Sequence, residues 1–147
     1  MKPSQVLALL GLLAAGGCMP DHPPAPEELA IDHFDDGEQL FAAGKYTDAA
    51  IEYEYALKHR PRWKAAYVRL GECHEKSGRE DDAIAVYERL LKLDRIDDDA
   101  LGGLGKIYAR RNDAARALGY YRQLKALHPD ERALDAEISR LEALRKP

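Results

Sequence analysis

Apolar residues recur at helical spacing from Ala30 to the end of the chain, with charged residues between them. No stretch of useful length alternates apolar and polar residues as a strand does, so the sequence predicts an all-α domain. Short turn signals divide the helical pattern into segments. The expected turns lie near Gly44, Arg60 and Pro61, Gly78, Asp94, Asn112, and His128 and Pro129.

The same residue types return every 34 positions, which indicates a repeated structural unit. A tyrosine, a glycine and an alanine each occur three times in this register, and a leucine occurs twice. One turn position is glycine in the first two copies and Asn112 in the third. The aligned residues are Tyr53, Tyr87 and Tyr121; Gly37, Gly71 and Gly105; Ala49, Ala83 and Ala117; Leu70 and Leu104; and Gly44 and Gly78.

This register resembles the tetratricopeptide repeat, a helix-turn-helix unit with Leu-Gly in its first helix and alanine and an aromatic residue in its second. The second copy shows the pattern in Leu70, Gly71 and Tyr87. The first copy is the weakest, with His33 and Asp36 at positions that are usually apolar. The resemblance implies a right-handed α-solenoid of three units, at residues 30–63, 64–97 and 98–131.

The last segment, residues 132–147, places Leu134, Ile138, Leu141 and Leu144 on one helical face among charged residues. A stack of repeats exposes an apolar end, which a terminal helix with a polar outer face can cover. We therefore expect a C-terminal capping helix.

Residues 1–17, MKPSQVLALLGLLAAGG, carry one charge, Lys2, ahead of a short apolar run. The run is too short to span a bilayer, which takes about 20 apolar residues. A basic start, an apolar stretch and small residues before a processing point are typical of a secretory signal peptide.

The letters AGGC that end at Cys18 resemble the lipobox of bacterial lipoproteins, which implies lipidation of Cys18. Several acyl chains hold a protein on a membrane durably, whereas one does not. Met19 resembles the signal for the outer membrane, so the resemblance implies an anchor in the cell envelope, on the periplasmic face of that membrane. The proline-rich residues 18–29 are expected to stay extended as a tether. An ordinary cleavage site, which would give a soluble secreted protein, is the alternative.

The charge balance argues against a nucleic acid partner. The net charge is −4 at pH 7 and becomes −5 without residues 1–17. The segment LGGLGK, from Leu101 to Lys106, lacks the spacing and the hydroxyl residue of a phosphate-binding loop. We interpret Gly105 instead as the small residue at which the two helices of a unit touch.

Other candidate chemistry is also incomplete. The acidic run that starts at Asp32 lacks the oxygen ligands of a calcium-binding loop. Cys73 and His74 have no third metal ligand beside them, and we interpret them as core residues. Ser77 and Ser139, the serines beyond the signal peptide, have no evident base. We therefore expect no enzyme, no cofactor, no metal and no small-molecule substrate.

In the resembled family, the first helices of successive units line a concave groove with their second, fifth, ninth, twelfth and thirteenth positions. Here these positions run from apolar in the first unit, through acidic, to basic in the third. The lysine and asparagine that grip a terminal carboxylate in some members are not paired at the fifth and ninth positions. The positions are Ile31, Phe34, Glu38, Phe41 and Ala42; Ala65, Val68, Glu72, Glu75 and Lys76; and Asp99, Gly102, Lys106, Ala109 and Arg110. The candidate partner-binding residues among them are Ile31, Phe34, Glu38, Phe41, Val68, Glu72, Glu75, Gly102, Lys106 and Arg110.

Two details of this groove stay open in the sequence. Gly102 either lowers the groove wall for a partner's backbone or is a tolerated glycine. Phe34 and Phe41 are either partner contacts or core residues of an irregular first unit.

These observations predict a membrane-anchored envelope lipoprotein that binds a partner protein or peptide in its groove. The resemblance implies a scaffold for envelope complex assembly or secretion, held at the membrane through lipid on Cys18. The alternative from another class is a regulatory adaptor of a cell-wall hydrolase.

Overall fold

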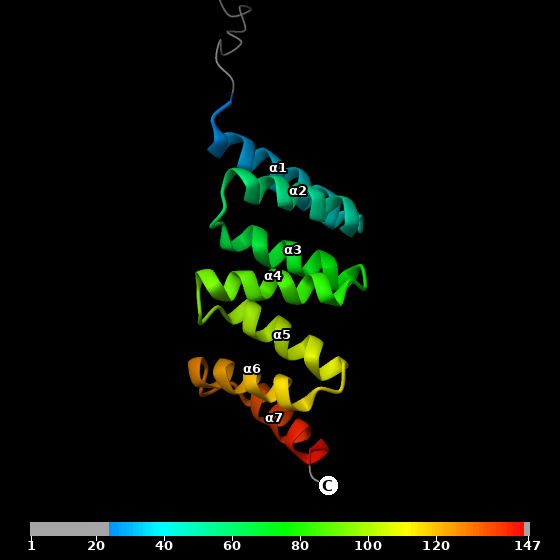
Figure 1. Cartoon of the computed structure of the whole chain (residues 1–147), viewed down its shortest axis with the longest axis vertical. Coiled ribbons are helices and arrows are strands. Elements are labelled where there is room, and N and C mark those ends of the chain that lie inside the picture. Colours follow the sequence, from blue (N-terminus) through cyan, green and yellow to red (C-terminus); the bar gives the residue numbers. More distant parts are fainter. Residues whose placement is uncertain (1–23, 146–147) are drawn as a thin grey trace, which may run out of the picture.

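The computed structural model describes residues 24–145, and this part of the chain contains seven α-helices and no strand. The helices follow one another in an elongated column, with α1 at one end and α7 at the other (Figure 1). The prediction of an all-α fold is confirmed. The helices are α1 (Pro26–Ala42), α2 (Tyr46–His59), α3 (Lys64–Lys76), α4 (Glu80–Leu93), α5 (Asp98–Arg110), α6 (Ala114–Leu127) and α7 (Arg132–Leu144).

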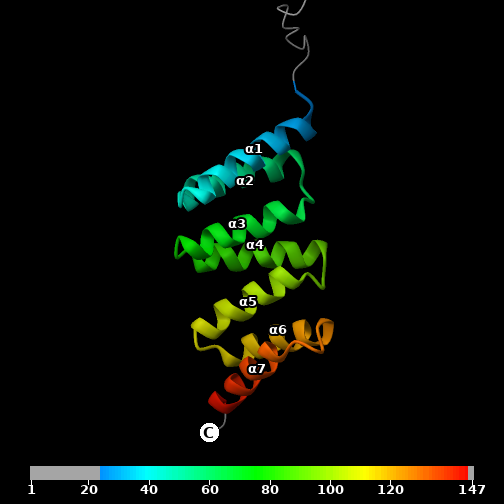
Figure 2. The same ribbon diagram turned by 180° about the vertical axis from the view of Figure 1, so that it is seen from behind.

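Consecutive helices pair into three hairpins, α1 with α2, α3 with α4 and α5 with α6, and α7 packs against α6 (Figure 2). Each hairpin also packs on the next through α2 with α3 and α4 with α5. Helices α3, α5 and α7 begin at Lys64, Asp98 and Arg132, so their starts keep the 34-residue period of the sequence. The predicted signal peptide and Cys18 lie outside the described residues.

Helix α1 begins at Pro26, so the extended tether predicted for residues 18–29 is wrong for residues 26–29. Proline suits the first helical turn, because its fixed φ fits a helix and its missing N–H has no partner there anyway. The Glu28 carboxylate accepts a hydrogen bond from the Ala25 backbone N–H at 2.9 Å, which closes the helix start. The proline content of this segment predicts an extended chain, but the position of Pro26 in the first helical turn is compatible with a helix.

The turn inside each hairpin contains one residue in the left-handed region, at Gly44 (φ 75°), Gly78 (φ 73°) and Asn112 (φ 59°). Glycine adopts this conformation without steric cost, and asparagine tolerates it better than most residues. The amide after each of these residues donates to a carbonyl of the helix just ended, at 2.8–2.9 Å. The turns predicted at these three positions are confirmed.

The helices of each hairpin touch where a glycine of the first helix meets a tyrosine of the second. A Cβ added to any of these glycines would lie 2.8 Å or less from the tyrosine ring. This contact confirms the interpretation of Gly105 and offsets the cost of glycine in a helix, about 0.5–1 kcal/mol relative to alanine. The pairs are Gly37 with Tyr53, Gly71 with Tyr87 and Gly105 with Tyr121.

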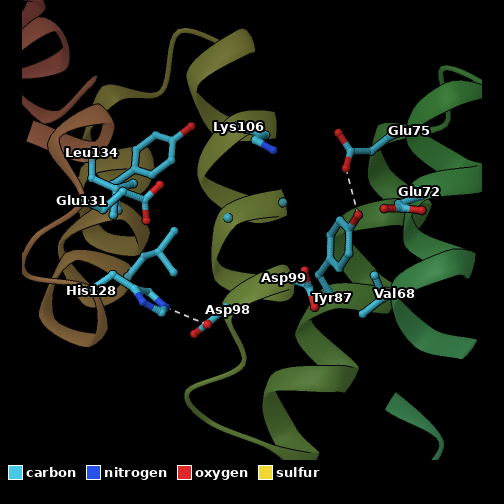
Figure 3. A pocket seen from close by; sticks show the side chains of 14 residues that line it. Val68, Glu72, Glu75, Tyr87, Asp98, Asp99, Lys106, His128, Glu131 and Leu134 are labelled. Atoms are coloured by element: carbon cyan, nitrogen blue, oxygen red, sulfur yellow. Dashed lines mark hydrogen bonds and ion pairs between the residues drawn. The ribbon is translucent and has the colours of Figure 1, made fainter. Parts of the chain in front are cut away.

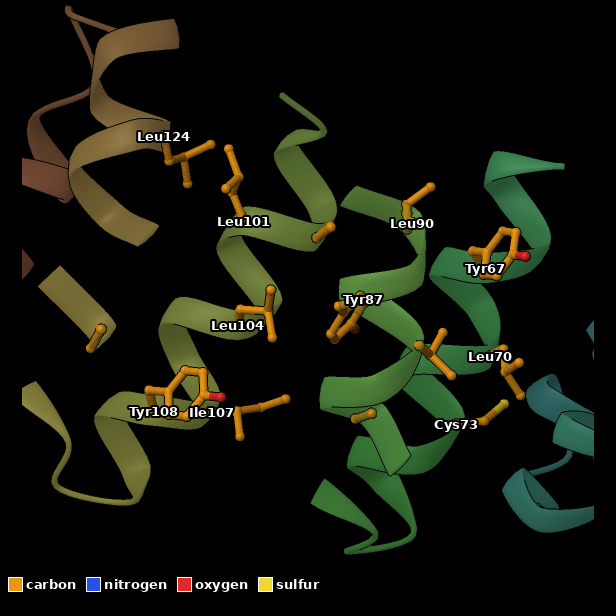
Figure 4. Close-up of a cluster of buried hydrophobic side chains, with 14 of the residues drawn as sticks. Tyr67, Leu70, Cys73, Tyr87, Leu90, Leu101, Leu104, Ile107, Tyr108 and Leu124 are labelled. Carbon is orange, nitrogen blue, oxygen red and sulfur yellow. The ribbon is translucent and has the colours of Figure 1, made fainter. Parts of the chain in front are cut away.

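Tyr87 is enclosed on two sides. A Cβ on Gly71 of α3 would lie 2.5 Å from its Cε1 atom, and a Cβ on Gly103 of α5 would lie 2.5 Å from its Cε2 atom. The ring therefore fills a slot between two helix backbones and joins the second hairpin to the third (Figure 4). Gly103 is explained by this second contact, which the sequence did not indicate.

Helix α7 covers the open end of the third hairpin. Leu134 and Leu141 are buried, and Ile138 packs against the core while remaining half-buried. Leu144, the last residue of α7, is 65% exposed, so the apolar face of the helix is buried only as far as Leu141. None of the helices in residues 24–145 has the length and apolar character needed to cross a membrane.

Candidate functional site

Two hollows lie along the side of the column formed by the first helices of the hairpins. The N-terminal pocket, between α1, α3 and the start of α5, is lined by Phe34, Glu38, Trp63, Lys64, Ala65, Val68, Arg69 and Asp99. The C-terminal pocket, between α3, α5 and the turn from α6 to α7, has residues Val68, Glu72, Glu75, Tyr87, Asp98, Asp99, Gly102, Gly103, Lys106, Tyr121, Leu124, His128, Glu131 and Leu134. Val68 and Asp99 line both pockets, so the two form one continuous groove.

The N-terminal pocket has an apolar floor. The rings of Phe34 and Trp63 stack with their centroids 4.5 Å apart, and Val68 lies beside them in the pocket wall. Trp63 is the N-cap of α3, so its indole lies at the end of the turn between α2 and α3. Stacked aromatic surfaces of this kind suit an apolar side chain of a partner.

Lys64 also lines the N-terminal pocket, but its charge is already neutralised. Its Nζ atom lies 2.6 Å from Oδ2 of the fully buried Asp97, and this hydrogen bond raises the pKa of Lys64. Asp97 in turn accepts the Ala100 backbone N–H at 2.9 Å and caps α5. The pair therefore serves the packing of α3 against the start of α5.

The C-terminal pocket is an open hollow of about 380 Å³ with acidic walls. In Figure 3, Val68, Glu72 and Glu75 lie on one side, His128, Glu131 and Leu134 lie on the other, and α5 runs between them. His128 Nε2 lies 2.7 Å from Oδ2 of Asp98, the first residue of α5.

Most groove carboxylates are held by side chains of the same protein. Glu38 accepts the Tyr53 hydroxyl at 2.6 Å and pairs with Arg69 at 2.7 Å. The same arrangement recurs one hairpin later, where Glu75 accepts the Tyr87 hydroxyl at 2.9 Å and pairs with Arg110, also at 2.9 Å. Burial and then the neighbouring Glu75 carboxylate raise the pKa of Tyr87, so its hydroxyl remains a donor.

Burial is likewise the main cause that raises the pKa of Tyr53, and Glu38 adds to it. Arg69 also bonds Glu72 at 2.9 Å, so it bridges carboxylates of α1 and α3. Asp99 and Lys106, in contrast, form no ion pair with any side chain in residues 24–145.

Seven of the ten residues predicted to bind a partner line the groove. They are Phe34, Glu38, Val68, Glu72, Glu75, Gly102 and Lys106. Ile31, Phe41 and Arg110 line neither pocket. Ile31 is 43% exposed outside the groove. The Phe41 ring packs edge-on against Tyr46 and lies under the guanidinium of Arg69, 5.0 Å away.

The basic end predicted for the third unit is wrong. Arg110 pairs with Glu75 and Glu80, both at 2.9 Å, and so is neutralised by the second hairpin. Lys106 is left as one ammonium group among the carboxylates of the C-terminal pocket. The groove is therefore apolar at its N-terminal end and acidic at its C-terminal end.

Several groove residues were not predicted from the sequence. Trp63 lies in the turn between the first two hairpins and His128 in the turn between α6 and α7, where the family register gives no expectation. Arg69 occupies a helix position outside that register and reaches the groove by its length. The remaining unpredicted residues come from other positions of α3 and α5, from α4, α6 and α7, and from the turn before α7: Lys64, Tyr87, Asp98, Gly103, Tyr121, Leu124, Glu131 and Leu134.

Cys73 and His74 are both buried in the core. Burial raises the pKa of the Cys73 thiol to about 12, which keeps it protonated and unreactive at neutral pH. Burial likewise lowers the pKa of His74. Among residues 24–145, no three His, Cys, Asp or Glu side chains are placed to hold a metal ion.

Three stacked helical hairpins, a terminal helix and a groove along the first helices define an α-solenoid with an extended binding surface. A family model of the tetratricopeptide repeat matches residues 34–97 and 81–132, and the chain belongs to this family.

Curated relatives share the repeats over part of their length. The chain is 31% identical over 90 residues to anaphase-promoting complex subunit 7 of Arabidopsis thaliana, which covers 61% of this chain and 16% of that protein. It is 30% identical over 101 residues to the peroxisomal targeting signal receptor of Komagataella phaffii, covering 67% of this chain and 18% of the receptor. The chain thus spans less than a fifth of the length of these relatives.

Solved structures show the same fold at lower identity. The first tetratricopeptide domain of Spaghetti (RPAP3), bound to the HSP90 peptide SRMEEVD, superposes with a TM-score of 0.73 at 17% identity, covering 82% of this chain and 96% of that one. The tetratricopeptide domain of OM64 from Arabidopsis superposes with a TM-score of 0.71 at 15% identity, over 79% of this chain and 96% of that domain.

Proposed function

We propose that this protein is a lipid-anchored scaffold of the bacterial cell envelope, whose groove binds an extended segment of a partner protein. The observation that carries the proposal is the continuous groove, because it joins an apolar pocket to a polar pocket across three successive first helices. Such a surface can grip several consecutive residues of an extended chain and needs no chemical step. The scaffold would position its partner during envelope complex assembly or secretion.

The likeness to a peptide-bound neighbour supports a peptide as the occupant. The first tetratricopeptide domain of Spaghetti was solved with an HSP90 peptide. The groove here offers Val68 and Glu72 in the second unit, and Gly102 and Lys106 in the third, where a carboxylate-gripping member would pair lysine with asparagine. We therefore propose a shared mode of docking with a different chemistry of recognition.

A substitution that fills the N-terminal pocket tests the groove. Ala65 is an exposed residue of α3 in the pocket wall, so tryptophan can be placed there without disturbing the core. We expect Ala65→Trp to reduce partner capture from bacterial membranes at least tenfold, measured by cross-linking to the tagged full-length chain and mass spectrometry.

The matched control is Ala126→Trp, at an exposed position of α6 that lines neither pocket. It should capture the same partner as the wild type. Equal capture by both variants would show that the partner binds another face and would remove the groove from the proposal.

The anchor has its own test. We expect Cys18→Ala to release the chain from membranes or to leave residues 1–17 uncleaved, because the proposed attachment depends on lipid at Cys18. Membrane fractionation and the intact mass of the mature protein measure this. A variant that stays in the membrane fraction with the mass of processed, unlipidated protein would contradict the anchor, and a wild type that is soluble would favour the secreted form.

A further inference from the structure

We propose that the groove selects an extended segment that carries an arginine or lysine next to an apolar residue, with Asp99 as the contact for the cation. This inference rests on the proposed function and assigns the chemistry of the partner. It follows from the charges of the groove, from the side chains that are already paired, and from the shape of the surface around Asp99.

Carboxylates dominate the C-terminal pocket. Five of them line it, against one ammonium group, that of Lys106. A surface of this sign attracts cationic segments and repels acidic ones, and low-dielectric walls strengthen the effect. The five are Glu72, Glu75, Asp98, Asp99 and Glu131.

Ion pairs and hydrogen bonds within the protein already occupy most of these five carboxylates, so few of them are available to a cation of a partner. Glu72 is bonded to Arg69, Glu75 to Tyr87 and Arg110, and Asp98 lies against His128. Asp99 and Glu131 form no side-chain ion pair within the described part of the chain. Asp99 is exposed in the first turn of α5 and lines both pockets, so it lies at the centre of the groove.

The cations near Asp99 are committed elsewhere. Lys64 is bonded to buried Asp97, and Arg69 bridges Glu38 and Glu72. The remaining ammonium group, on Lys106, is seven residues further along α5, about 10 Å at 1.5 Å per residue. Asp99 helps to raise the pKa of Lys64 without forming an ion pair with it. No side chain within residues 24–145 therefore forms an ion pair with Asp99, and a cation from a partner can do so.

The surface beside Asp99 lets a main chain approach. Gly102 follows Asp99 by nearly one helical turn and lines the C-terminal pocket. A Cβ at Gly102 would meet only Cδ2 of Leu124, at an ordinary 3.7 Å, so the groove floor there is helix backbone with free space above it. Of the two readings of Gly102 that the sequence left open, the proposal uses the first, in which the lowered groove wall admits the backbone of a partner.

The apolar residue of the partner, next to its cation, would bind in the N-terminal pocket, which Asp99 also lines. The N-terminal pocket that contains Asp99 also contains the stacked rings of Phe34 and Trp63. Alternate residues of an extended chain point to opposite sides, so neighbouring side chains can enter the aromatic pocket and reach Asp99 from one backbone. Lys106 repels a second cation at the far end, which confines the basic part of the segment to the region of Asp99.

A selection experiment tests this assignment on the full-length chain in detergent micelles. A phage library of random nonapeptides is selected on the wild type, on Asp99→Asn and on the matched control Asp36→Asn, which removes an exposed carboxylate of α1 outside both pockets. We expect wild-type and control selections to enrich arginine or lysine next to an aromatic or aliphatic residue. The Asp99→Asn selection should lose the cation and keep the apolar residue.

Binding of one selected peptide then gives the magnitude by fluorescence anisotropy. Asp99→Asn should weaken it about three- to tenfold, Asp36→Asn should leave it unchanged, and replacing the peptide's cation by glutamate should abolish it. Rising salt should weaken wild-type binding more than Asp99→Asn binding.

The outcomes separate this inference from the proposed function. If no peptide family is enriched, the groove does not bind extended segments and both fall. If neutral or acidic peptides are enriched and Ala65→Trp blocks them, the groove function stands and the charge selection is wrong. If basic peptides are enriched but Asp99→Asn binds them as the wild type does, the role of Asp99 is overturned.

Discussion

Deletion of residues 130–147 should lower the free energy of unfolding by about 3–6 kcal/mol. The deletion removes α7 with Leu134 and Leu141, which are 6% and 1% exposed, and each such leucine contributes about 1.5–3 kcal/mol. It also uncovers the apolar side of α6 that these leucines protect. The exposed pairs of α7 with α6, Arg122 with Glu142 and Lys125 with Asp135, add little by comparison.

Urea denaturation followed by circular dichroism measures this change. The control is Leu144→Ala, because Leu144 is 65% exposed and its truncation should alter stability by no more than about 0.5 kcal/mol. A deletion variant as stable as the full chain would mean that α7 is not needed to close the stack.

Two adjacent glycines should respond to the same substitution with opposite signs. Gly103→Ala should destabilise the protein by about 1 kcal/mol net, because its Cβ would lie 2.5 Å from a Tyr87 ring that Gly71 encloses on the other side. Overpacking of this kind costs about 1–3 kcal/mol and sometimes more, whereas alanine regains about 1 kcal/mol of helix propensity. The ring cannot move aside, so the steric cost is the larger.

Gly102→Ala is the matched control and should stabilise the protein by about 0.5–1 kcal/mol. Its Cβ meets a single side-chain atom at 3.7 Å, so the gain in helix propensity is not opposed. Denaturant midpoints of both variants measure these two changes in stability. If Gly103→Ala were as stable as Gly102→Ala, the slot around Tyr87 would be looser than the structure indicates.

The fold could be predicted because the repeated glycines and tyrosines make the same contact in every hairpin. Tyr87 and Gly71 recur with the period because every hairpin needs a ring against a helix backbone. Gly103 breaks the period, since it serves the junction between two hairpins, and a search for repeats could not explain it. The start of α1 at Pro26 could not be predicted from composition, because the same prolines that favour an extended chain are also compatible with a first helical turn.

The groove was predictable only in part. The register of the first helices placed Phe34, Val68 and Gly102 correctly along the surface. Its charge could not be predicted, because the reach of Arg110 toward Glu75 depends on how one hairpin is rotated against the next. Residues in turns, such as Trp63, also carry no periodic signal.

The pairing of arginines with glutamates along the groove has a mechanical consequence. Arg69 ties α3 to α1 through Glu38, and Arg110 ties α5 to α3 through Glu75. Helices elsewhere pack mainly on their neighbours in the sequence. The two ion pairs therefore act as cross-links between the first helices of successive hairpins. A ligand that drew either arginine away from its glutamate would remove one of these cross-links, and we expect the two hairpins that it joins to move more freely against each other.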